Sequence, residues 1–240
     1  MIRAVTFDAD GTLWDFEQAM RDALAVALLE LQGLVPRHAA ARAAALTLAD
    51  LAATRDRVAA ELRPANPTLE QVRIAAFARK LEELGSPDPA LASHLFERYV
   101  EHRYAATRPY DDVLPTLDAL AGLDPGPIVG LISNGNTDPA RCGLSGRFQF
   151  ALYASPRAAA KPDRHLFDLA LREARCEPSA LVHVGDSLAN DVAGARALGI
   201  RAVWLNRDGL PNTTTIMPDA EIATLAELPD LIGEPPRAGR

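Results

Sequence analysis

Two aspartates that directly follow a short apolar run constrain this chain more than any other feature. Residues 1–7, Met-Ile-Arg-Ala-Val-Thr-Phe, favour a buried strand because β-branched and aromatic side chains are frequent in the run. Asp8 and Asp10 come next, and residues two positions apart at a strand end point the same way. Two ionised carboxylates about 4 Å apart repel by roughly 4 kcal/mol at an effective dielectric of about 20. The stretch therefore predicts a site for a cation or a shared proton, with an Asp-rich turn closed by Gly11 as the simpler alternative.

Composition and charge exclude several classes of protein. The apolar fraction of 48% and the charged fraction of 24% are typical of a soluble globular chain, and 240 residues allow one or two domains. A net charge of −7 argues against a nucleic-acid partner. No apolar run has the length of a membrane span, and aspartates stand where a signal peptide would have its apolar core. Cys142 and Cys176 lack metal-ligand spacing, so we expect a reduced, cytoplasmic setting.

Lysine is rare in this chain. Of 25 basic residues, only Lys80 and Lys161 are lysines, and arginine supplies the other positive charges. The two side chains are not interchangeable at a compact anion site, where an ammonium group acts as a point charge. This usage singles out Lys161 before any motif is considered.

Residues 15–106 have the periodicity of helices. Ala, Leu, Arg and Glu dominate this segment, and glycines and prolines interrupt it at intervals. The pattern predicts a helical bundle inserted directly after the first strand, with the Ala-rich run 39–45 helical as well. Its cations are expected mostly on solvated helix faces, with a second anionic group of a substrate as the alternative ligand: Arg55, Arg57, Arg63 and Lys80.

From residue 107 onward the pattern alternates between strands and helices. Alternation of this kind predicts an α/β fold with a doubly wound, mostly parallel, Rossmann-like sheet. The predicted domains are therefore a core formed by 1–14 plus 107–240 and an insertion formed by 15–106. Strands are expected at 128–132, 148–154, 181–184, 200–205 and near 221–222. Helices are expected at 111–121, 163–175, 189–198 and up to about 232, followed by a disordered tail at 234–240.

Polar clusters follow three of the predicted strands. Ligands of doubly wound sheets bind beyond the carboxyl ends of the strands, so we expect these clusters to converge. The chain has no Walker A run and no GxGxxG after its first strand, which excludes the usual P-loop and dinucleotide sites. The clusters are Asp8 with Asp10, Ser133 with Asn134, and Asp186.

Four segments, in order, resemble motifs I to IV of the haloacid dehalogenase-like (HAD) superfamily. They are Asp8-Ala9-Asp10-Gly11-Thr12-Leu13, Ile132-Ser133-Asn134-Gly135, Lys161-Pro162-Asp163, and Gly185-Asp186-Ser187-Leu188-Ala189-Asn190-Asp191. The resemblance covers 1–14 and about 107–232. It implies that the helical insertion is a C1 cap, which closes over the site, excludes water and selects the leaving group.

The resemblance implies hydrolysis of a phosphate ester. Asp8 would be the nucleophile that forms an aspartyl-phosphate, and Asp10 would donate a proton to the leaving group and then take one from water. Ser133 and the backbone N–H of Asn134 would bind the phosphoryl oxygens. Lys161 would contact the phosphate and keep Asp8 ionised.

The same resemblance implies a magnesium site. Mg²⁺ prefers oxygen ligands, which Asp8, Asp186 and the backbone carbonyl of Asp10 would supply. Asp191 is expected to hold waters or to orient a neighbouring group, with direct ligation as the alternative.

Taken singly, each cluster also fits a strand-end turn, a surface lysine or a helix cap. Taken together, they predict a Mg²⁺-dependent phosphatase for a small phosphorylated metabolite of nucleotide or sugar phosphate type. The alternatives are a phosphomutase of the β-phosphoglucomutase type and a non-catalytic ligand-binding protein on the same fold. Haloacid dehalogenases resemble this core but lack an acid at the position of Asp10, so its presence favours phosphoryl chemistry. We expect His183 to be a satisfied core residue or a support for the residues of the site. We expect Trp14 and Phe16 to pack against the hinge, with a place at the mouth of the pocket as the alternative.

Overall fold

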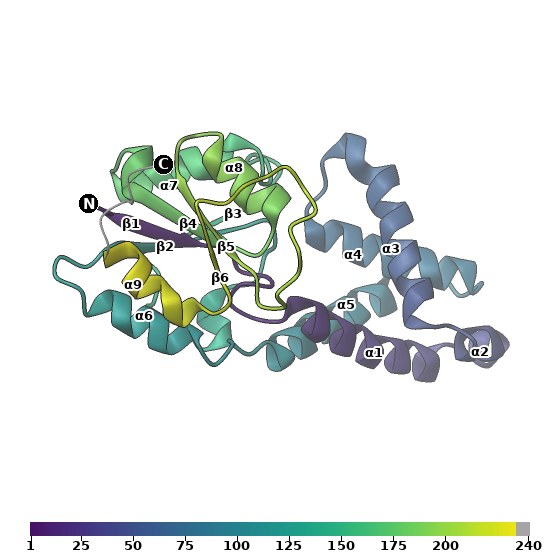
Figure 1. Cartoon of the computed structure of the whole chain (residues 1–240). Helices are drawn as coiled ribbons and strands as arrows, with labels where there is room; N and C mark the ends of the chain where they lie inside the picture. The colour runs from purple at the N-terminus through teal and green to yellow at the C-terminus, as the bar shows by residue number, and fades with distance from the viewer. Residues whose placement is uncertain (234–240) are drawn as a thin grey trace. The chain divides into compact units, whose positions relative to one another are not determined.

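A computed structural model describes residues 1–233 (Figure 1). The predicted disordered tail, 234–240, lies outside the described residues. The chain forms two compact units, of which the first contains Met1–Asp15 and the chain from Arg108 onward. The second unit is Phe16–Thr107.

The first unit is built on a six-stranded sheet in the order β3-β2-β1-β4-β5-β6. Every neighbouring pair of these strands is parallel, which confirms the predicted α/β sheet. The strands are β1 (Ala4–Phe7), β2 (Ile128–Ser133), β3 (Phe150–Tyr153), β4 (Leu181–Gly185), β5 (Arg201–Leu205) and β6 (Ala220–Ile222).

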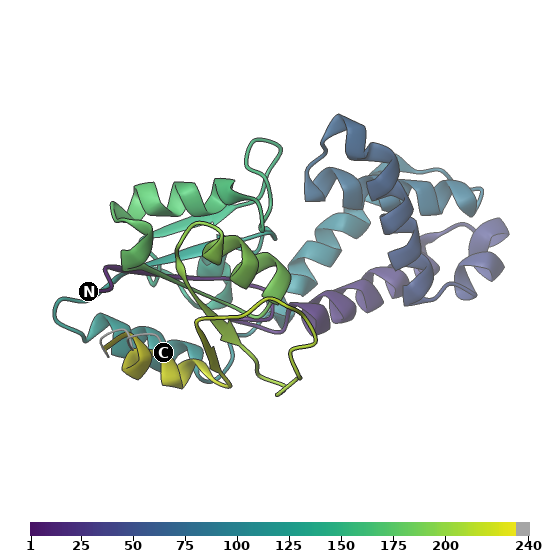
Figure 2. The same ribbon diagram turned by 45° about the horizontal axis from the view of Figure 1, so that its top comes forward.

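Helices cover both faces of this sheet. In Figures 1 and 2, α7 (Arg164–Ala174) and α8 (Ala193–Arg196) lie on one face, and α6 (Val113–Ala121) and α9 (Leu228–Gly233) lie on the other. Leu166 and Phe167 of α7 are fully buried in the same apolar cluster as strand residues. Burying a leucine or phenylalanine side chain contributes about 1.5–3 kcal/mol, so this layer stabilises the sheet that carries the polar clusters.

The strand register brings those clusters to one edge. Phe7 of β1 is paired with Leu131 on one side and with Val184 on the other. Because the strands are parallel, the residues that follow each of them lie at the same end of the sheet. Asp8 and Asp186 therefore follow neighbouring strands at this carboxyl edge.

One predicted helix differs in its local geometry. The sequence favours a regular helix at 189–198, but the structure has a π-helix at Leu188–Val192 before the short α8. The backbone N–H of Val192 donates to the carbonyl of Ser187 at 3.2 Å, which is an i to i+5 hydrogen bond. The apolar pattern does not distinguish this wider turn from an α-helical one, because both follow the same face.

The second unit is helical, as its periodicity predicts. Threonines cap two of its helices, where Thr47 and Thr68 each form a capping box with the residue three positions on. Leu31, Leu81 and Leu95 are fully buried in its apolar core. The helices are α1 (Phe16–Leu34), α2 (Arg37–Ala44), α3 (Leu48–Leu62), α4 (Leu69–Glu83) and α5 (Pro89–Ala106).

Three of the four cations considered in this segment have acidic partners within it. Arg57 and Lys80 both contact Glu83, at 2.8 and 2.6 Å. Arg55 contacts Asp56 at 3.0 Å. Lys80 is only 6% exposed, so it does not share the solvated position that is expected for most of these cations.

The short helical turns are Arg63–Ala65, Pro139–Cys142, Pro178–Ala180 and Leu225–Glu227. Within residues 1–233, every helix is too short or too polar to cross a membrane.

Candidate active site

Lys161 contacts several of the groups that meet at the carboxyl edge of the sheet. Its Nζ donates to Oδ1 of Asp8 at 2.6 Å, to Oδ1 of Asp191 at 2.6 Å and to the carbonyl of Ile132 at 2.8 Å. An ammonium group has three N–H donors, so each of them has an acceptor here. The residue is 3% exposed, and its contacts join the ends of β1 and β2 to the segment after β4.

The end of β2 holds the loop that carries Lys161. The side-chain amide of Asn134 donates to the carbonyl of Lys161 at 2.9 Å, and its oxygen accepts from the Lys161 N–H at 2.7 Å. Ser133 is buried, and its Oγ accepts from the N–H of Gly135 at 2.9 Å. The Asn134 side chain is therefore engaged in positioning Lys161, and the serine hydroxyl keeps its own hydrogen to donate.

Asp191 orients Lys161 by a hydrogen bond to its ammonium group. Its Oδ1 accepts from Lys161 and lies 3.2 Å from Nε2 of His183, and its Oδ2 accepts from the N–H of Ser187 at 3.0 Å. Burial alone would raise the pKa of Asp191, but Lys161 and His183 outweigh it and lower the pKa to about 2. Both oxygens of Asp191 are thus occupied by protein donors, which favours the orienting role over direct metal ligation.

His183 belongs to the same network. It is fully buried, and its Nδ1 lies 3.0 Å from Oγ1 of Thr6, its partner in the register of β1 and β4. Its ring also packs edge-on against Phe167 at 5.1 Å between centroids. Burial lowers the pKa of His183, so the imidazole is neutral at neutral pH.

The cluster carries more negative than positive charge. Asp8, Asp186 and Asp191 each offer an oxygen, and these oxygens lie within 4.8 Å of one another. Burial and the charge of Asp191 raise the pKa of Asp8 well above its ordinary value, in spite of Lys161. Burial and Asp191 likewise raise the pKa of Asp186 to about 6. Lys161 lowers the pKa of Asp8, which is the expected direction, but burial and the charge of Asp191 outweigh it in the protein alone.

This surplus of charge fits a hard divalent cation. Mg²⁺ takes oxygen ligands, and one lysine among three carboxylates leaves net negative charge for a cation to balance. Asp8, Asp186 and the backbone carbonyl of Asp10 are the residues that would hold such an ion.

Glycines make room for three of the carboxylates. A Cβ atom on each of these glycines would lie 2.3–2.5 Å from an aspartate atom, far inside van der Waals contact. Gly11 also has φ of +84°, which other residues rarely adopt. The pairs are Gly11 with Asp186, Gly135 with Asp10, and Gly185 with Asp191.

Asp10 is held by a residue whose polar role sequence reasoning missed. Nε1 of Trp14 donates to Oδ1 of Asp10 at 2.8 Å, and the indole is fully buried. Trp14 is thus a packed residue, as expected, and also a hydrogen-bond donor to a predicted site residue. No sequence signal indicates this contact, because an indole at this spacing fits apolar packing equally well.

A family model described as a haloacid dehalogenase-like hydrolase matches residues 2–199 of this chain. The chain belongs to the haloacid dehalogenase-like hydrolases. It is therefore a hydrolase, as the four motifs predict.

Other proteins of this kind differ in the reactions for which they are named. The chain is 36% identical over 105 residues to 5-amino-6-(5-phospho-D-ribitylamino)uracil phosphatase YigB of Escherichia coli, an alignment that spans 42% of this chain and 44% of that protein. It is 27% identical to glyceraldehyde 3-phosphate phosphatase of Methanopyrus kandleri over 98% of each chain. The crystal structure of a 2-haloacid dehalogenase from Pseudomonas syringae has 34% identity and a TM-score of 0.82, covering 97% of this chain and 99% of that one.

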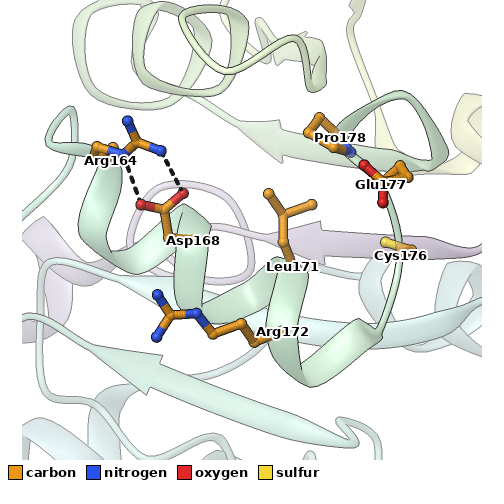
Figure 3. Close-up of a pocket in the computed structure, with 7 residues that line it drawn as sticks. All are labelled: Arg164, Asp168, Leu171, Arg172, Cys176, Glu177 and Pro178. Atoms are coloured by element: carbon orange, nitrogen blue, oxygen red, sulfur yellow. Dashed lines mark hydrogen bonds and ion pairs between the residues drawn. The ribbon is translucent and has the colours of Figure 1, made fainter.

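A pocket on this hydrolase lies along α7 and extends to the residues before β4 (Figure 3). The ion pair of Arg164 with Asp168, at 2.7 Å, lies at one end of it. Burial raises the pKa of the Cys176 thiol in this pocket, which makes it a poor nucleophile. None of the residues predicted for catalysis lines this pocket, so the carboxyl edge remains the candidate active site.

Proposed function

We propose that this protein is a Mg²⁺-dependent phosphatase that acts on a small phosphorylated metabolite, of nucleotide or sugar phosphate type. The first unit would be the catalytic core and the second unit the cap. The observation that carries this proposal is the pair of carboxylates after β1, where Asp8 contacts Lys161 and Asp10 contacts Trp14. These contacts give the two carboxylates different environments and hence different roles.

The proposed reaction has two steps. Because Lys161 takes Oδ1 of Asp8, we assign the attack on phosphorus to Oδ2. The new Oδ2–P bond forms as the P–O bond to the leaving group breaks, and Asp10 gives its proton to the leaving oxygen. Water then attacks the phosphorus, Asp10 takes a proton from that water, and inorganic phosphate leaves Asp8.

Neighbouring groups would stabilise the phosphoryl oxygens. The Ser133 hydroxyl and the backbone N–H of Asn134 are the proposed donors, and Lys161 supplies positive charge beside Asp8. Mg²⁺, when bound by Asp8, Asp186 and the carbonyl of Asp10, would neutralise charge on the phosphate.

Dehalogenation is a second candidate, because the Pseudomonas syringae protein of 34% identity is named a 2-haloacid dehalogenase. A halide leaves without a proton, so that reaction has no use for a general acid at the position of Asp10. A phosphomutase would share the first step but pass the phosphoryl group to a sugar hydroxyl. It would then need a bisphosphate for turnover. A non-catalytic ligand-binding protein would turn over none of these compounds.

The test is phosphate release from a panel of phosphate esters, with Mg²⁺ and with EDTA. The panel would contain p-nitrophenyl phosphate, glyceraldehyde 3-phosphate, sugar phosphates and nucleoside monophosphates, with 2-chloropropionate assayed for chloride. We expect Mg²⁺-dependent phosphate release that Asp8→Asn abolishes. Asp230→Asn, the same substitution at an exposed position in α9, should keep the activity. Chloride release without phosphate release, or activity retained by Asp8→Asn, would overturn the proposal.

A further inference from the structure

The hydrogen bond from Trp14 makes the two oxygens of Asp10 chemically different. Nε1 of the buried indole donates to Oδ1 at 2.8 Å. An indole N–H can only donate, and the C=O oxygen of a carboxylic acid accepts more strongly than its O–H oxygen, so this contact favours Oδ1 as the oxygen without a proton. The hydrogen bond from Trp14 therefore favours Oδ2 as the oxygen that carries a proton on this carboxyl group.

The second oxygen lies in a different direction. A Cβ atom on Gly135 would be 2.4 Å from Oδ2 of Asp10 and 3.3 Å from Oγ of Ser133. Oδ2 therefore lies against the end of β2, near the serine proposed to bind the phosphoryl group. The absence of a side chain at Gly135 leaves the space that this oxygen occupies.

The loop that carries Trp14 is anchored from three directions. The N–H of Gly11 donates to the carbonyl of Trp14 at 2.9 Å, and the N–H of Tyr110 donates to that of Leu13 at 2.9 Å. Nη2 of Arg207 donates to the carbonyl of Thr12 at 2.9 Å. These bonds hold the loop, and with it the indole that donates to the Asp10 carboxyl group. A carboxyl group held in one orientation is preorganised for proton transfer.

We propose that Trp14 is a positioning residue that directs the transferable proton to Oδ2 of Asp10. This inference rests on the proposed phosphatase function. The proton on Oδ2 moves to the leaving oxygen as the P–O bond of the ester breaks, and Oδ2 accepts a proton from water in the second step. Oδ1 stays hydrogen-bonded to the indole throughout and takes no part in the transfer.

The chain offers a matched control for this role. The chain has two tryptophans, and the second, Trp204 on β5, donates its Nε1 to the backbone carbonyl of Asp186 at 2.9 Å. Replacing either indole with phenyl removes one N–H donor and a similar volume. Only the change at Trp14 removes the donor to Asp10.

The experiment compares Trp14→Phe, Trp204→Phe, Asp10→Asn and the Trp14→Phe/Asp10→Asn double variant on a series of substituted phenyl phosphates and one alkyl phosphate. A p-nitrophenolate leaving group needs little protonation, whereas an alkoxide needs a general acid, whose contribution is typically about 10²- to 10⁴-fold. Trp14→Phe should lose about tenfold or more in kcat with the alkyl phosphate and much less with p-nitrophenyl phosphate. Trp204→Phe should keep the wild-type dependence of kcat on the pKa of the leaving group.

Two outcomes would overturn the inference. One is an equal loss by Trp14→Phe across all leaving groups. The other concerns the double variant. If Trp14 acts through Asp10, adding Trp14→Phe to Asp10→Asn should not make kcat depend more steeply on the pKa of the leaving group, and a steeper dependence would contradict the inference. If Trp14→Phe unfolds, replacement of the indole at position 14 by its benzothiophene isostere removes only the N–H and gives the same comparison. A wild-type protein that releases no phosphate from any ester would instead contradict the proposed function.

Discussion

The ammonium group of Lys161 is buried, and protein acceptors take the place of water in all three of its hydrogen bonds. Burial alone lowers the pKa of Lys161, but Asp8 and Asp191 outweigh it and raise the pKa above its ordinary value. The lysine therefore stays charged at neutral pH. Removing one partner of a buried ion pair typically costs about 3–5 kcal/mol, because the other charges are left uncompensated.

We expect Lys161→Met to lower the free energy of unfolding by about 3 kcal/mol and to abolish turnover, since Asp8 and Asp191 would then repel without a cation between them. Urea denaturation measures the first effect and phosphate release the second. Lys80→Met, at the other lysine of the chain, is the control. Glu83 would keep its contact with Arg57 there, so the loss of stability should be smaller. Equal losses in the two variants would contradict this account of Lys161.

His183 should make the free energy of unfolding fall as the pH drops below about 6.5. The unfolded histidine has a pKa of about 6.5, whereas burial lowers the pKa of His183 in the folded protein. Below about pH 6.5 the unfolded chain therefore binds the extra proton, and the free energy of unfolding falls by up to about 1.4 kcal/mol per pH unit.

The measurement for this histidine is urea denaturation at several pH values. His183→Gln should remove this part of the slope, and the difference from wild type isolates it from the titration of Asp186. His165→Gln, at an exposed position on α7, should keep the wild-type slope. An unchanged slope in His183→Gln would mean that the imidazole is already protonated in the folded protein.

At the scale of elements, the π-helix and the glycine before it place Asp191. Val192 bonds back to Ser187, and the widened turn lets the Asp191 carboxylate accept the Ser187 N–H at 3.0 Å and reach Lys161. The carboxylate then lies against Gly185, the last residue of β4. The end of β4 and the turn that follows it therefore fix the position of the Asp191 carboxylate together.

Gly185→Ala should disrupt this arrangement of β4, the turn and the Asp191 carboxylate. The new Cβ would lie 2.3 Å from Cγ of Asp191, so the carboxylate must move away from Lys161. We expect a loss of about 1–3 kcal/mol in the free energy of unfolding, as is usual for overpacking, together with lower kcat. Gly33→Ala in α1, where no atom lies within 4 Å, should be neutral or stabilising by up to about 1 kcal/mol. Thermal unfolding and phosphate release distinguish the two substitutions.

At the scale of the whole molecule, two apolar cores lie in two units of one chain. One core surrounds α7 and the sheet, and the other lies among the helices of Phe16–Thr107. Trp14 and Trp204 are both in the first unit, whereas the long helices α1, α3, α4 and α5 are in the second. Tryptophan fluorescence therefore reports on the first unit, and circular dichroism at 222 nm reports mainly on the second.

We expect urea unfolding curves from these two probes to have different midpoints, because separate cores unfold separately. Mg²⁺ should raise the midpoint seen by fluorescence more than the midpoint seen by circular dichroism, since its proposed ligands lie in the first unit. Superimposable curves in both conditions would show that the chain unfolds as a single cooperative body.

Local patterns were sufficient to predict most of the fold. The apolar runs at 128–132 and 181–184 form β2 and β4, and the Ala-rich run 39–45 forms most of α2. Asp163 caps α7 by accepting from the N–H of His165 at 2.9 Å. Such features depend on neighbours within a few residues, so sequence alone determines them.

The chemistry of the carboxyl edge depended on contacts between distant segments. Lys161 meets Asp8 across 153 positions of the chain, and Thr6 meets His183 across 177. Side-chain positions to within a fraction of an ångström decide whether Lys161 contacts one carboxylate or two. They also decide which oxygen of Asp10 accepts from the Trp14 indole. By itself the sequence determined which residues reach this edge, because the strand ends are local. Only the tertiary structure decided how they share charge and hydrogen bonds, because those interactions require side chains from separate strands and loops to meet.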